Sequence, residues 1–396
     1  MLGVNAVPDV TTMFNANTYN PTNNSLINCS IRFTESQAFS FKGNSNLIEN
    51  CSFYAIDWAV ADRPGLMNSI YNEGKSNIFR RNTVNLCGAS STLYPGDFPV
   101  VELNRITETG FLQSDGSITQ LTIGAQPNSQ TRFNWFHNTI KSGARFDAPI
   151  PPVVWGHGGT MRHNVVWETN IGLMQKGEYH FCYNNSVFNC EKNGIVILDD
   201  ASDGGGGNVG TITRNNFSDK LSGDRNINMK VPGTADHNWN GYQTEKDFRY
   251  QIHDYENRDF RPRANSNLVD AGVSAEGVND RYMGAAPDIG AYEFGDTIYW
   301  IAGRQFEKAS SPIPLDKGKS NYYFVDLMWL EGYKSTSSGV YFGMSESAVL
   351  LADRGSPEFM GNQTNNIFSP GDLKANQEYY WRVDANCRDT VVKGNV

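Results

Sequence analysis

The sequence predicts an all-β protein in which a right-handed parallel β-helix, a solenoid, is followed by a small β-sandwich domain. Three observations support this prediction: a recurring asparagine motif, a composition rich in uncharged polar residues, and a change of pattern near residue 300. Hydrophobic residues make up 39% of the chain and charged residues 19%, which is typical of a folded globular protein. The chain has 396 residues, which is long for one ordinary domain and favours two.

The motif is an Asn beside small or β-branched residues, with apolar residues alternating on either side. Eight copies occur at intervals of 21 to 34 residues, centred on Asn28, Asn50, Asn82, Asn104, Asn138, Asn164, Asn185 and Asn216. The short intervals match one coil of three strands, and the long ones match a coil with an inserted loop. We therefore expect an Asn ladder between coils. A β-sandwich with Asn-rich turns is the alternative, and eight copies in phase argue against it.

The interior of the predicted β-helix follows from the alternation of apolar residues around the motif. We expect Ile27, Ile48, Phe79, Phe133 and Ile212 to fill it. A second recurring phrase, Gly followed by alternating residues, contributes another strand to each coil. Its inward residues are expected to be Phe111, Ala144, Leu173 and Ile195. The residues between them should then lie side by side on one outer face, roughly 4.8 Å apart per coil.

Bulk properties exclude several kinds of protein. A net charge of −9 argues against a nucleic-acid partner, because the sequence shows no basic stripe that would release counterions. No apolar run approaches the roughly 18 residues of a membrane span, and the first ten residues do not form a signal peptide. We expect that the first coils precede this start. None of the six cysteines forms a CxxC pair, and Cys29 and Cys51 share one motif position, which favours free thiols.

The outer face of the second phrase concentrates charge, which makes it the candidate active site. Lys176 is a candidate Brønsted base, and Arg145 has the planar fork that neutralises a carboxylate or sulfate. Asp115 and Asp147 are candidates for the acid and base of glycoside hydrolysis. Asp199 continues the face on a later coil. The alternative is a ladder of alternating charges that only stabilises the stack.

Loops next to this face supply further candidates. Loop 148–159 would place Trp155 and the catalytic candidate His157 over the groove, with Glu178 and His180 nearby. Loop 88–100 would place Tyr94 on the opposite wall as a substrate-binding residue. Three carboxylates before the Gly-rich stretch 204–207 are candidate ligands for Ca²⁺, although their spacing matches no EF-hand. These candidate metal ligands are Asp199, Asp200 and Asp203.

The C-terminal third contains phrases of another kind. PDIGAYEF (287–294) resembles the closing motif of many bacterial right-handed β-helix proteins, and 259–272 resembles the segment before it. We therefore expect the β-helix to occupy 1–300 and this motif to cap its last coils. Residues 301–320 are expected to be a linker. Residues 321–396, with LKANQEYYWRVDA (373–385), resemble a fibronectin type III-like β-sandwich that lacks its last strand.

Together these features resemble secreted bacterial right-handed β-helix proteins of polysaccharide degradation. The resemblance implies a secreted, periplasmic or cell-surface protein, and it fixes architecture better than reaction, because this fold hosts lyases, hydrolases and binding proteins. The first hypothesis is cleavage of an acidic polysaccharide, uronate or sulfated, including those of algae, by β-elimination. The related chondroitinase B and alginate lyase families use a Lys, an Arg and Ca²⁺. Here Arg145 precedes Lys176, the reverse order, so those roles are not carried over.

Two other hypotheses stay open. A glycoside hydrolase would use Asp115 and Asp147. The polygalacturonase pattern does not support it, because Gly-His-Gly (156–158) here precedes Asp199-Asp200 instead of following it. A glycan-binding module or adhesin would show aromatic platforms without a converging acid and base.

Overall fold

The structure is a computed structural model. It describes residues 21–58, 68–89, 91–113, 115–121, 126–147, 156–199, 207–244, 247–322 and 324–396. The chain divides into two units. The first runs to Gln251 and includes Ala264–Glu293 and Ala302–Arg304. The second consists of Ile252–Arg263, Phe294–Ile301 and Gln305–Val396.

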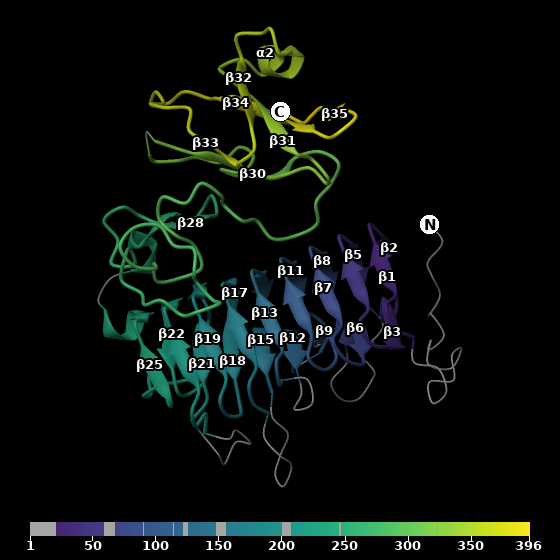
Figure 1. Ribbon diagram of the computed structural model, residues 1–396, viewed down its shortest axis with the longest axis vertical. Coiled ribbons are helices and arrows are strands. Elements are labelled where there is room, and N and C mark those ends of the chain that lie inside the picture. The colour runs from purple at the N-terminus through teal and green to yellow at the C-terminus, as the bar shows by residue number, and fades with distance from the viewer. Residues whose placement is uncertain are drawn as a thin grey trace. The chain divides into compact units, whose positions relative to one another are not determined.

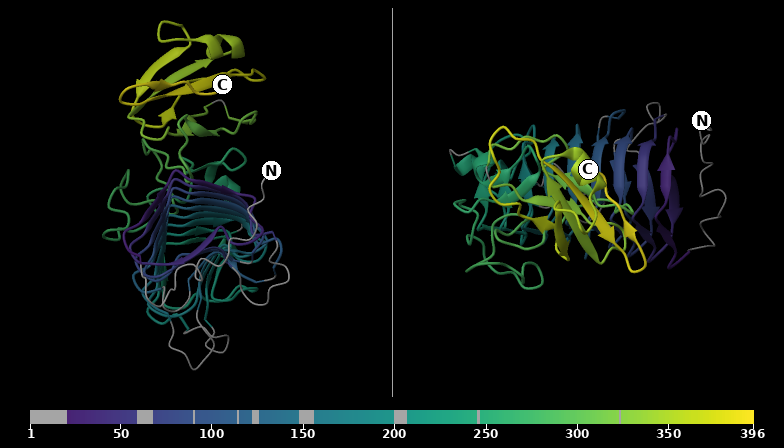
Figure 2. Two further views of the ribbon diagram at one scale, coloured as in Figure 1. Left: turned by 90° about the vertical axis from the view of Figure 1, so that its right-hand side faces the viewer. Right: turned by 90° about the horizontal axis from the view of Figure 1, so that it is seen from above.

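The first unit is a parallel β-helix, as the sequence predicts. Each coil adds one short strand to each of three sheets, and every pair of neighbouring strands is parallel (Figure 1). The left-hand view of Figure 2 looks along the stack of coils. The interior is continuous from coil to coil, because short strands with alternating side chains bury one face each.

Among the described residues, the first sheet has nine strands. They are β1 (Ser25–Ile27), β4 (Leu47–Glu49), β7 (Ile78–Arg80), β10 (Val100–Glu102), β13 (Gln130–Arg132), β16 (Thr160–Arg162), β19 (Phe181–Tyr183), β22 (Ile212–Arg214) and β25 (Thr234–Asp236). The second sheet also has nine strands in the described ranges. They are β2 (Ser30–Arg32), β5 (Ser52–Ile56), β8 (Thr83–Cys87), β11 (Arg105–Thr109), β14 (Trp135–Thr139), β17 (Val165–Thr169), β20 (Ser186–Phe188), β23 (Phe217–Ser218) and β26 (Trp239–Asn240).

The third sheet has eight strands in the part of the chain that the structure describes. They are β3 (Phe39–Lys42), β6 (Asn68–Glu73), β9 (Ser91–Tyr94), β12 (Ser117–Leu121), β15 (Ser142–Phe146), β18 (Leu173–Gln175), β21 (Ile195–Ile197) and β24 (Leu221–Ser222). Two short 3₁₀ helices, η3 (Gly241–Gln243) and η4 (Phe248–Tyr250), follow the last coil.

A two-residue turn joins the first sheet to the second in every coil, and it contains the Asn ladder. Its first residue has positive φ, and its second is a buried Asn in most coils. The Nδ2 of Asn134 donates to Asn164 Oδ1 in the next coil at 3.0 Å and to the Val101 carbonyl at 2.8 Å. Each such Asn therefore links three coils. The ladder consists of Asn82, Asn104, Asn134, Asn164, Asn185, Asn216 and Asn238.

The ladder corrects the predicted motif at three places. Asn134, not Asn138, is the ladder residue of its coil, and Asn138 is exposed within β14. In the first two coils, Asn28 and Asn50 occupy the positive-φ position of the turn, and Cys51 follows at the ladder position, where its backbone N–H donates to Asn82. Asn tolerates positive φ, so it suits both turn positions and the motif does not separate them.

The interior predictions are correct for some residues and wrong for others. Ile48 and Phe79 are buried, as are the three inward residues Ala144, Leu173 and Ile195. Ile27 and Phe111 are exposed, at 42% and 43%, and Phe133 and Ile212 are half-buried on the outside. The positive-φ residue in the turn interrupts the alternation of inward and outward side chains. The alternation of apolar residues in the sequence does not show where this interruption falls.

The closing motif does not stack on the end of the coils. Residues 290–292 lie against the outer face of the second sheet, where the backbone N–H of Ala291 donates to Ser186 Oγ at 2.9 Å. The Trp135 Nε1–H donates to the Tyr292 hydroxyl at 2.9 Å. The outer face of the second sheet is therefore covered along several coils.

The second unit consists of small antiparallel sheets and one short helix. Its elements in the described ranges are β27 (Ile252–Asp254), β28 (Asp259–Pro262), β29 (Ser310–Ile313), β30 (Leu327–Leu330), β31 (Ser337–Gly343), α2 (Glu346–Leu351), β32 (Phe359–Gln363), β33 (Ile367–Phe368), β34 (Tyr380–Asn386) and β35 (Val391–Val392). Buried Arg382 in β34 pairs with Asp384 at 2.9 Å and donates to the carbonyls at the end of α2. The fibronectin type III-like identity of this unit stays a prediction.

The cysteines agree with the prediction of free thiols. All six cysteines are free, and Cys51 is buried. Within the described ranges, none of the helices has the length and apolarity that crossing a membrane requires.

Candidate active site

The outer face of the third sheet presents side chains of one coil directly beside those of the next. Arg145 in β15 is in register with Gln120 in β12. Phe146 is in register with Gln175, which sets the next residues along the chain, Asp147 and Lys176, side by side. The parallel register thus gathers residues that are far apart in the sequence.

Four of the predicted residues form one ion-pair network. Asp147 binds Lys176 Nζ through Oδ1 at 3.0 Å and Arg145 Nη2 through Oδ2 at 2.8 Å. The second guanidinium nitrogen, Arg145 Nη1, lies 3.2 Å from Asp115 Oδ1. The side chains of Arg145, Lys176 and Asp147 are 12%, 11% and 18% exposed, whereas that of Asp115 is 71% exposed. Three members are therefore held in a half-buried group, and Asp115 reaches it from solvent.

The electrostatics of Asp115 follow from this pairing. Burial raises the pKa of Asp115, but the Arg145 guanidinium and the Gly116 N–H lower it by more. The result is a pKa below the ordinary value of an aspartic acid. Asp115 is therefore a carboxylate at neutral pH, which suits an ion-pair partner and not a proton donor.

Two neutral residues that the sequence does not single out support the network. Gln120 is buried, and its Nε2 donates to Asp147 Oδ2 at 3.0 Å. Its Oε1 accepts from Ser91 Oγ at 3.1 Å. This chain of hydrogen bonds fixes the orientation of the Asp147 carboxylate. Ser91 lies in β9, within the stretch 88–100 that was predicted to be a loop, and Gln120 lies in β12, where no strand was predicted. Both residues are uncharged, so only their place in the register identifies them.

Tyr94 lies on the same outer row as Arg145, toward the N-terminal coils. Leu93 is in register with Thr119, so that Tyr94 lies beside Gln120, and Gln120 lies beside Arg145. Its ring stacks on that of Tyr71, with centroids 5.0 Å apart and planes at 17°. The Tyr71 hydroxyl donates to Glu73 at 3.1 Å. Burial, and then Glu73, raise the pKa of Tyr71, which keeps the phenol protonated.

His180 differs from the expectation that it binds substrate, because it is fully buried. Its Nδ1 accepts from the Gly159 N–H at 3.1 Å, so Nε2 carries the proton and donates to the Lys176 carbonyl at 2.9 Å. Burial lowers its pKa to about 4. His180 is therefore neutral at pH 7, and its place in the structure is to hold the backbone of Lys176.

The remaining candidates are separate from the network. His157 is exposed and Glu178 is half-buried, and a backbone bridge joins the two residues. Trp155 lies outside the described residues. Asp200 and Asp203 also lie outside them, and Asp199 is exposed. No cluster of three or more His, Cys, Asp or Glu side chains suited to a metal occurs among the described residues, so the Ca²⁺ site stays a prediction.

Comparisons with known proteins add little to this geometry. No family model and no curated protein matches the chain. Among solved structures, it is similar to the crystal structure of the pectate lyase Pel9A, with 15% sequence identity and a TM-score of 0.38. The match covers 70% of this chain and 89% of that chain. A likeness this distant supports no inference about the reaction.

Proposed function

We propose that the chain is an enzyme that cleaves an acidic polysaccharide by β-elimination on the outer face of the third sheet. One observation carries the proposal. Arg145 is anchored by Asp147 on one nitrogen, while its other nitrogen pairs with the exposed Asp115, directly beside Lys176. A substrate carboxylate that displaced Asp115 would meet the same guanidinium edge. We also propose that the protein acts outside the cytoplasm, because a long acidic polymer does not cross a membrane.

The chemistry assigns a role to each member. The fork of Arg145 neutralises the uronate carboxylate, which makes the neighbouring C5 proton more acidic. Lys176, as the neutral amine, removes that proton. The electron pair of the C5–H bond forms the C4=C5 double bond as the C4–O bond breaks, and the leaving oxygen takes up a proton. Asp147 is a positioning residue, because it orients Arg145 and Lys176 through ion pairs and does not itself react with the sugar.

The hydrolase alternative fits the geometry less well. Hydrolysis needs a carboxylic acid that holds its proton at working pH. Both carboxylates bind the same Arg145 guanidinium, and the pKa of Asp115 is lowered.

The test is to incubate the full chain with uronate and sulfated polysaccharides, with neutral dextran as a control. Ultraviolet absorbance from a new double bond is recorded together with new reducing ends. Both signals together are expected. Reducing ends alone would mean hydrolysis, and neither signal with retained binding would mean a glycan-binding protein, so each of these two results would overturn the proposal.

Variants then test the site. Lys176→Ala should lower the rate by about 100-fold or more, the usual contribution of a general base. The exposed Lys192→Ala is the matched control and should leave the rate unchanged. If Lys176→Ala and Asp147→Asn both kept full activity, the reaction would not take place at this network.

A further inference from the structure

A second charged row lies on the outer face of the first sheet, away from the candidate active site. Successive coils contribute one residue each through the parallel register, at roughly 4.8 Å per coil. We name this row the arginine strip. Its members are Arg80, Glu102, Arg132, Arg162, Tyr183, Arg214 and Asp236.

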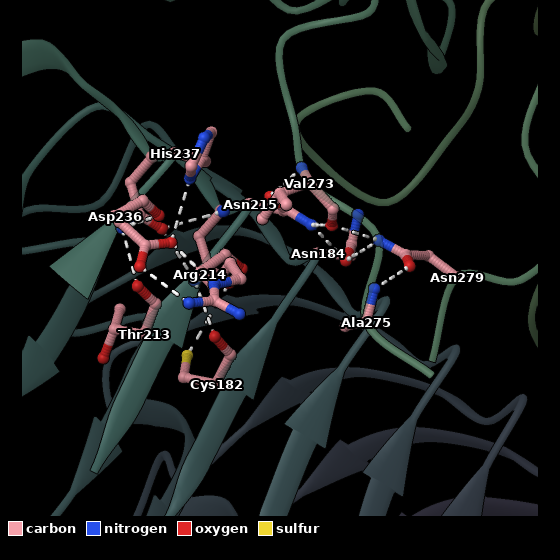
Figure 3. Close-up of polar contacts among 12 residues, drawn as sticks. Cys182, Asn184, Thr213, Arg214, Asn215, Asp236, His237, Val273, Ala275 and Asn279 are labelled. Carbon is pink, nitrogen blue, oxygen red and sulfur yellow. Dashed lines mark hydrogen bonds and ion pairs between the residues drawn. The ribbon is translucent and has the colours of Figure 1, made fainter. Parts of the chain in front are cut away.

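The strip has more cations than its own carboxylates neutralise. Glu102 is shared by two arginines, at 2.6 Å from Arg80 Nε and 2.7 Å from Arg132 Nε. Arg214 and Asp236 form a two-pronged pair at 2.6 and 2.8 Å (Figure 3). Four guanidinium groups thus face two carboxylates within the strip, and a third carboxylate, Glu49, is in register with Arg80 at its N-terminal end. This local excess of positive charge occurs in a chain whose net charge is −9.

The excess positive charge of the strip is located at Arg162. It lies in register beside Arg132, a like charge, and no ion pair involves it among the described residues. Its guanidinium lies over the Phe133 ring, 5.2 Å from the centroid, and Phe133 in turn stacks on His163 at 4.9 Å. Burial and Arg132 lower the pKa of Arg162 to about 10, and the carboxylates of Glu102 and Asp280 offset part of that lowering. An anion at this point would relieve the repulsion.

Aromatic rings continue the strip on the next coil. Phe181 and Tyr183 point outward from β19, with ring centroids 5.8 Å apart and planes at 25°. Phe181 is half-buried, so part of its ring faces solvent. Flat apolar rings beside guanidinium forks provide both contacts that a charged sugar needs: a stacking surface and a bidentate donor.

A loop borders the strip along one side. Asn184 and Asn215 directly follow Tyr183 and Arg214 in the turn to the second sheet. Asn215 Nδ2 donates to the Val273 carbonyl at 2.8 Å, and the Val273 N–H donates to Asn215 Oδ1 at 3.0 Å. Asn279 Nδ2 donates to Asn184 Oδ1 at 3.3 Å. Figure 3 shows these contacts beside the Arg214–Asp236 pair, so segment 273–279 is anchored at the edge of the strip.

We infer that the arginine strip is a second binding site, which holds carboxylate or sulfate groups of an acidic polysaccharide at Arg162 and Arg132 with sugar faces on Phe181. The ligand class rests on the proposed function, but the site uses a different sheet and none of the candidate catalytic residues. Its role is to retain the polymer between cleavage events. Arginine is suited to it because the guanidinium stays charged and grips such anions with two parallel bonds.

The test measures binding of the full chain to a polyuronate, a sulfated polysaccharide and neutral dextran. Every variant is built on Arg145→Gln, which weakens binding at the candidate active site. Arg162→Gln should lower the affinity for the anionic polymers by about ten-fold, the loss expected for one charge-assisted contact. Arg162→Lys, which keeps the charge without the fork, should give a smaller loss. Exposed Arg32→Gln, on the second sheet, is the matched control and should bind as its parent does.

The two anionic polymers show which group the strip prefers. Thermal melting confirms that each variant is folded. Equal affinity of Arg162→Gln, Arg162→Lys and the parent would overturn the inference, and so would equal binding to dextran. Binding of single-stranded DNA as tight as that of the sugars would overturn the polysaccharide assignment.

A last readout separates this inference from the proposed function. With Arg145 restored, Arg162→Gln should cleave short oligosaccharides at the rate of the unmodified chain and retain long polymers poorly. Absence of cleavage in every variant would refute the proposed function and leave the binding result to stand alone.

Discussion

Two ion-pair knots in the β-helix share one plan and differ in one respect. On the first sheet, Glu102 joins Arg80 and Arg132, and on the third sheet, Asp147 joins Arg145 and Lys176. Each knot is one carboxylate between two cations. Buried Glu102 lies between arginines of the coils on either side, and half-buried Asp147 lies between Arg145 of its own coil and Lys176 of the next. Only the third-sheet knot has an additional exposed carboxylate, Asp115, on its arginine.

That difference distinguishes the candidate active site from the first-sheet knot. Arg80 and Arg132 both pair with the carboxylate that the fold places between them, so in the arginine strip Arg132 would bind a ligand only together with the neighbouring Arg162. Arg145 has one nitrogen fixed and another bound to a partner that solvent can replace at low cost, because exposed ion pairs contribute little stability. A site of this kind is organised before its ligand arrives, which lowers the cost of binding.

The largest expected effect is a loss of stability that concerns both knots. Arg132 and Arg145 belong to the coil that the Asn134 side chain links to the neighbouring coils. Asn134→Ala would remove four buried hydrogen bonds, those that the Asn134 side chain makes with the Val101 carbonyl, with Asn164 Oδ1, and with the N–H and Nδ2 of Asn104. At about 1 kcal/mol or more each, the free energy of unfolding should fall by about 4 kcal/mol, measured by denaturant unfolding. Asn138→Gly, at an exposed positive-φ position, is the control and should change it by less than about 1 kcal/mol. Equal losses would contradict the ladder assignment.

The second prediction concerns the third-sheet knot alone, through His180 beneath Lys176. Its pKa is lowered from 6.5 to about 4 by burial. Between these values the unfolded chain binds a proton that the folded chain does not, so stability is lost as the pH falls from 6.5 to 4. The loss amounts to about 3 kcal/mol at 1.36 kcal/mol per pH unit. His180→Gln should remove this part of the pH dependence in unfolding curves at pH 7 and pH 4. An unchanged pH dependence would mean that His180 is protonated in the folded state.

The third prediction compares the two central carboxylates directly. Asp147→Asn should lower the cleavage rate by about 100-fold, while Glu102→Gln leaves it unchanged. Both variants should lose similar, small amounts of stability. Equal cleavage rates in Asp147→Asn and Glu102→Gln would contradict the positioning role of Asp147.

Sequence periodicity was enough to predict the fold and to set Arg145 and Lys176 on adjacent coils. Both inferences depend only on the count of residues per coil, which the Asn motif reports. In the stretch RFNWFHN the motif does not identify the ladder residue. This stretch contains two Asn residues four positions apart, and both fit a turn. Which of them is buried depends on the coils above and below, which a single stretch does not encode.

The rest of the site depends on orientation. Two positive-φ residues, Gly177 at +118° and Tyr179 at +53°, lie between β18 and His180, and the imidazole is buried. The nearness of His180 to Lys176 in the sequence therefore predicted the position of His180 correctly, but not the direction of its side chain. Gln120 was missed for another reason. The strand of its coil was expected at 110–115 instead of in β12, and a neutral amide does not stand out in a search for charged side chains, although it donates to Asp147.

The segment at 290–292 has a consequence for how the solenoid unfolds. In a repeat protein each coil touches only its neighbours, so the stack can fray from either end one coil at a time. Here residues 290, 291 and 292 contact Asn215, Ser186 and Trp135, and Gly303 and Arg304 bind Leu103 and Thr83. These contacts connect coils that are not adjacent in the stack. A coil between them cannot unfold without breaking the contacts of other coils. Unfolding should therefore be more cooperative than the repeat alone would allow.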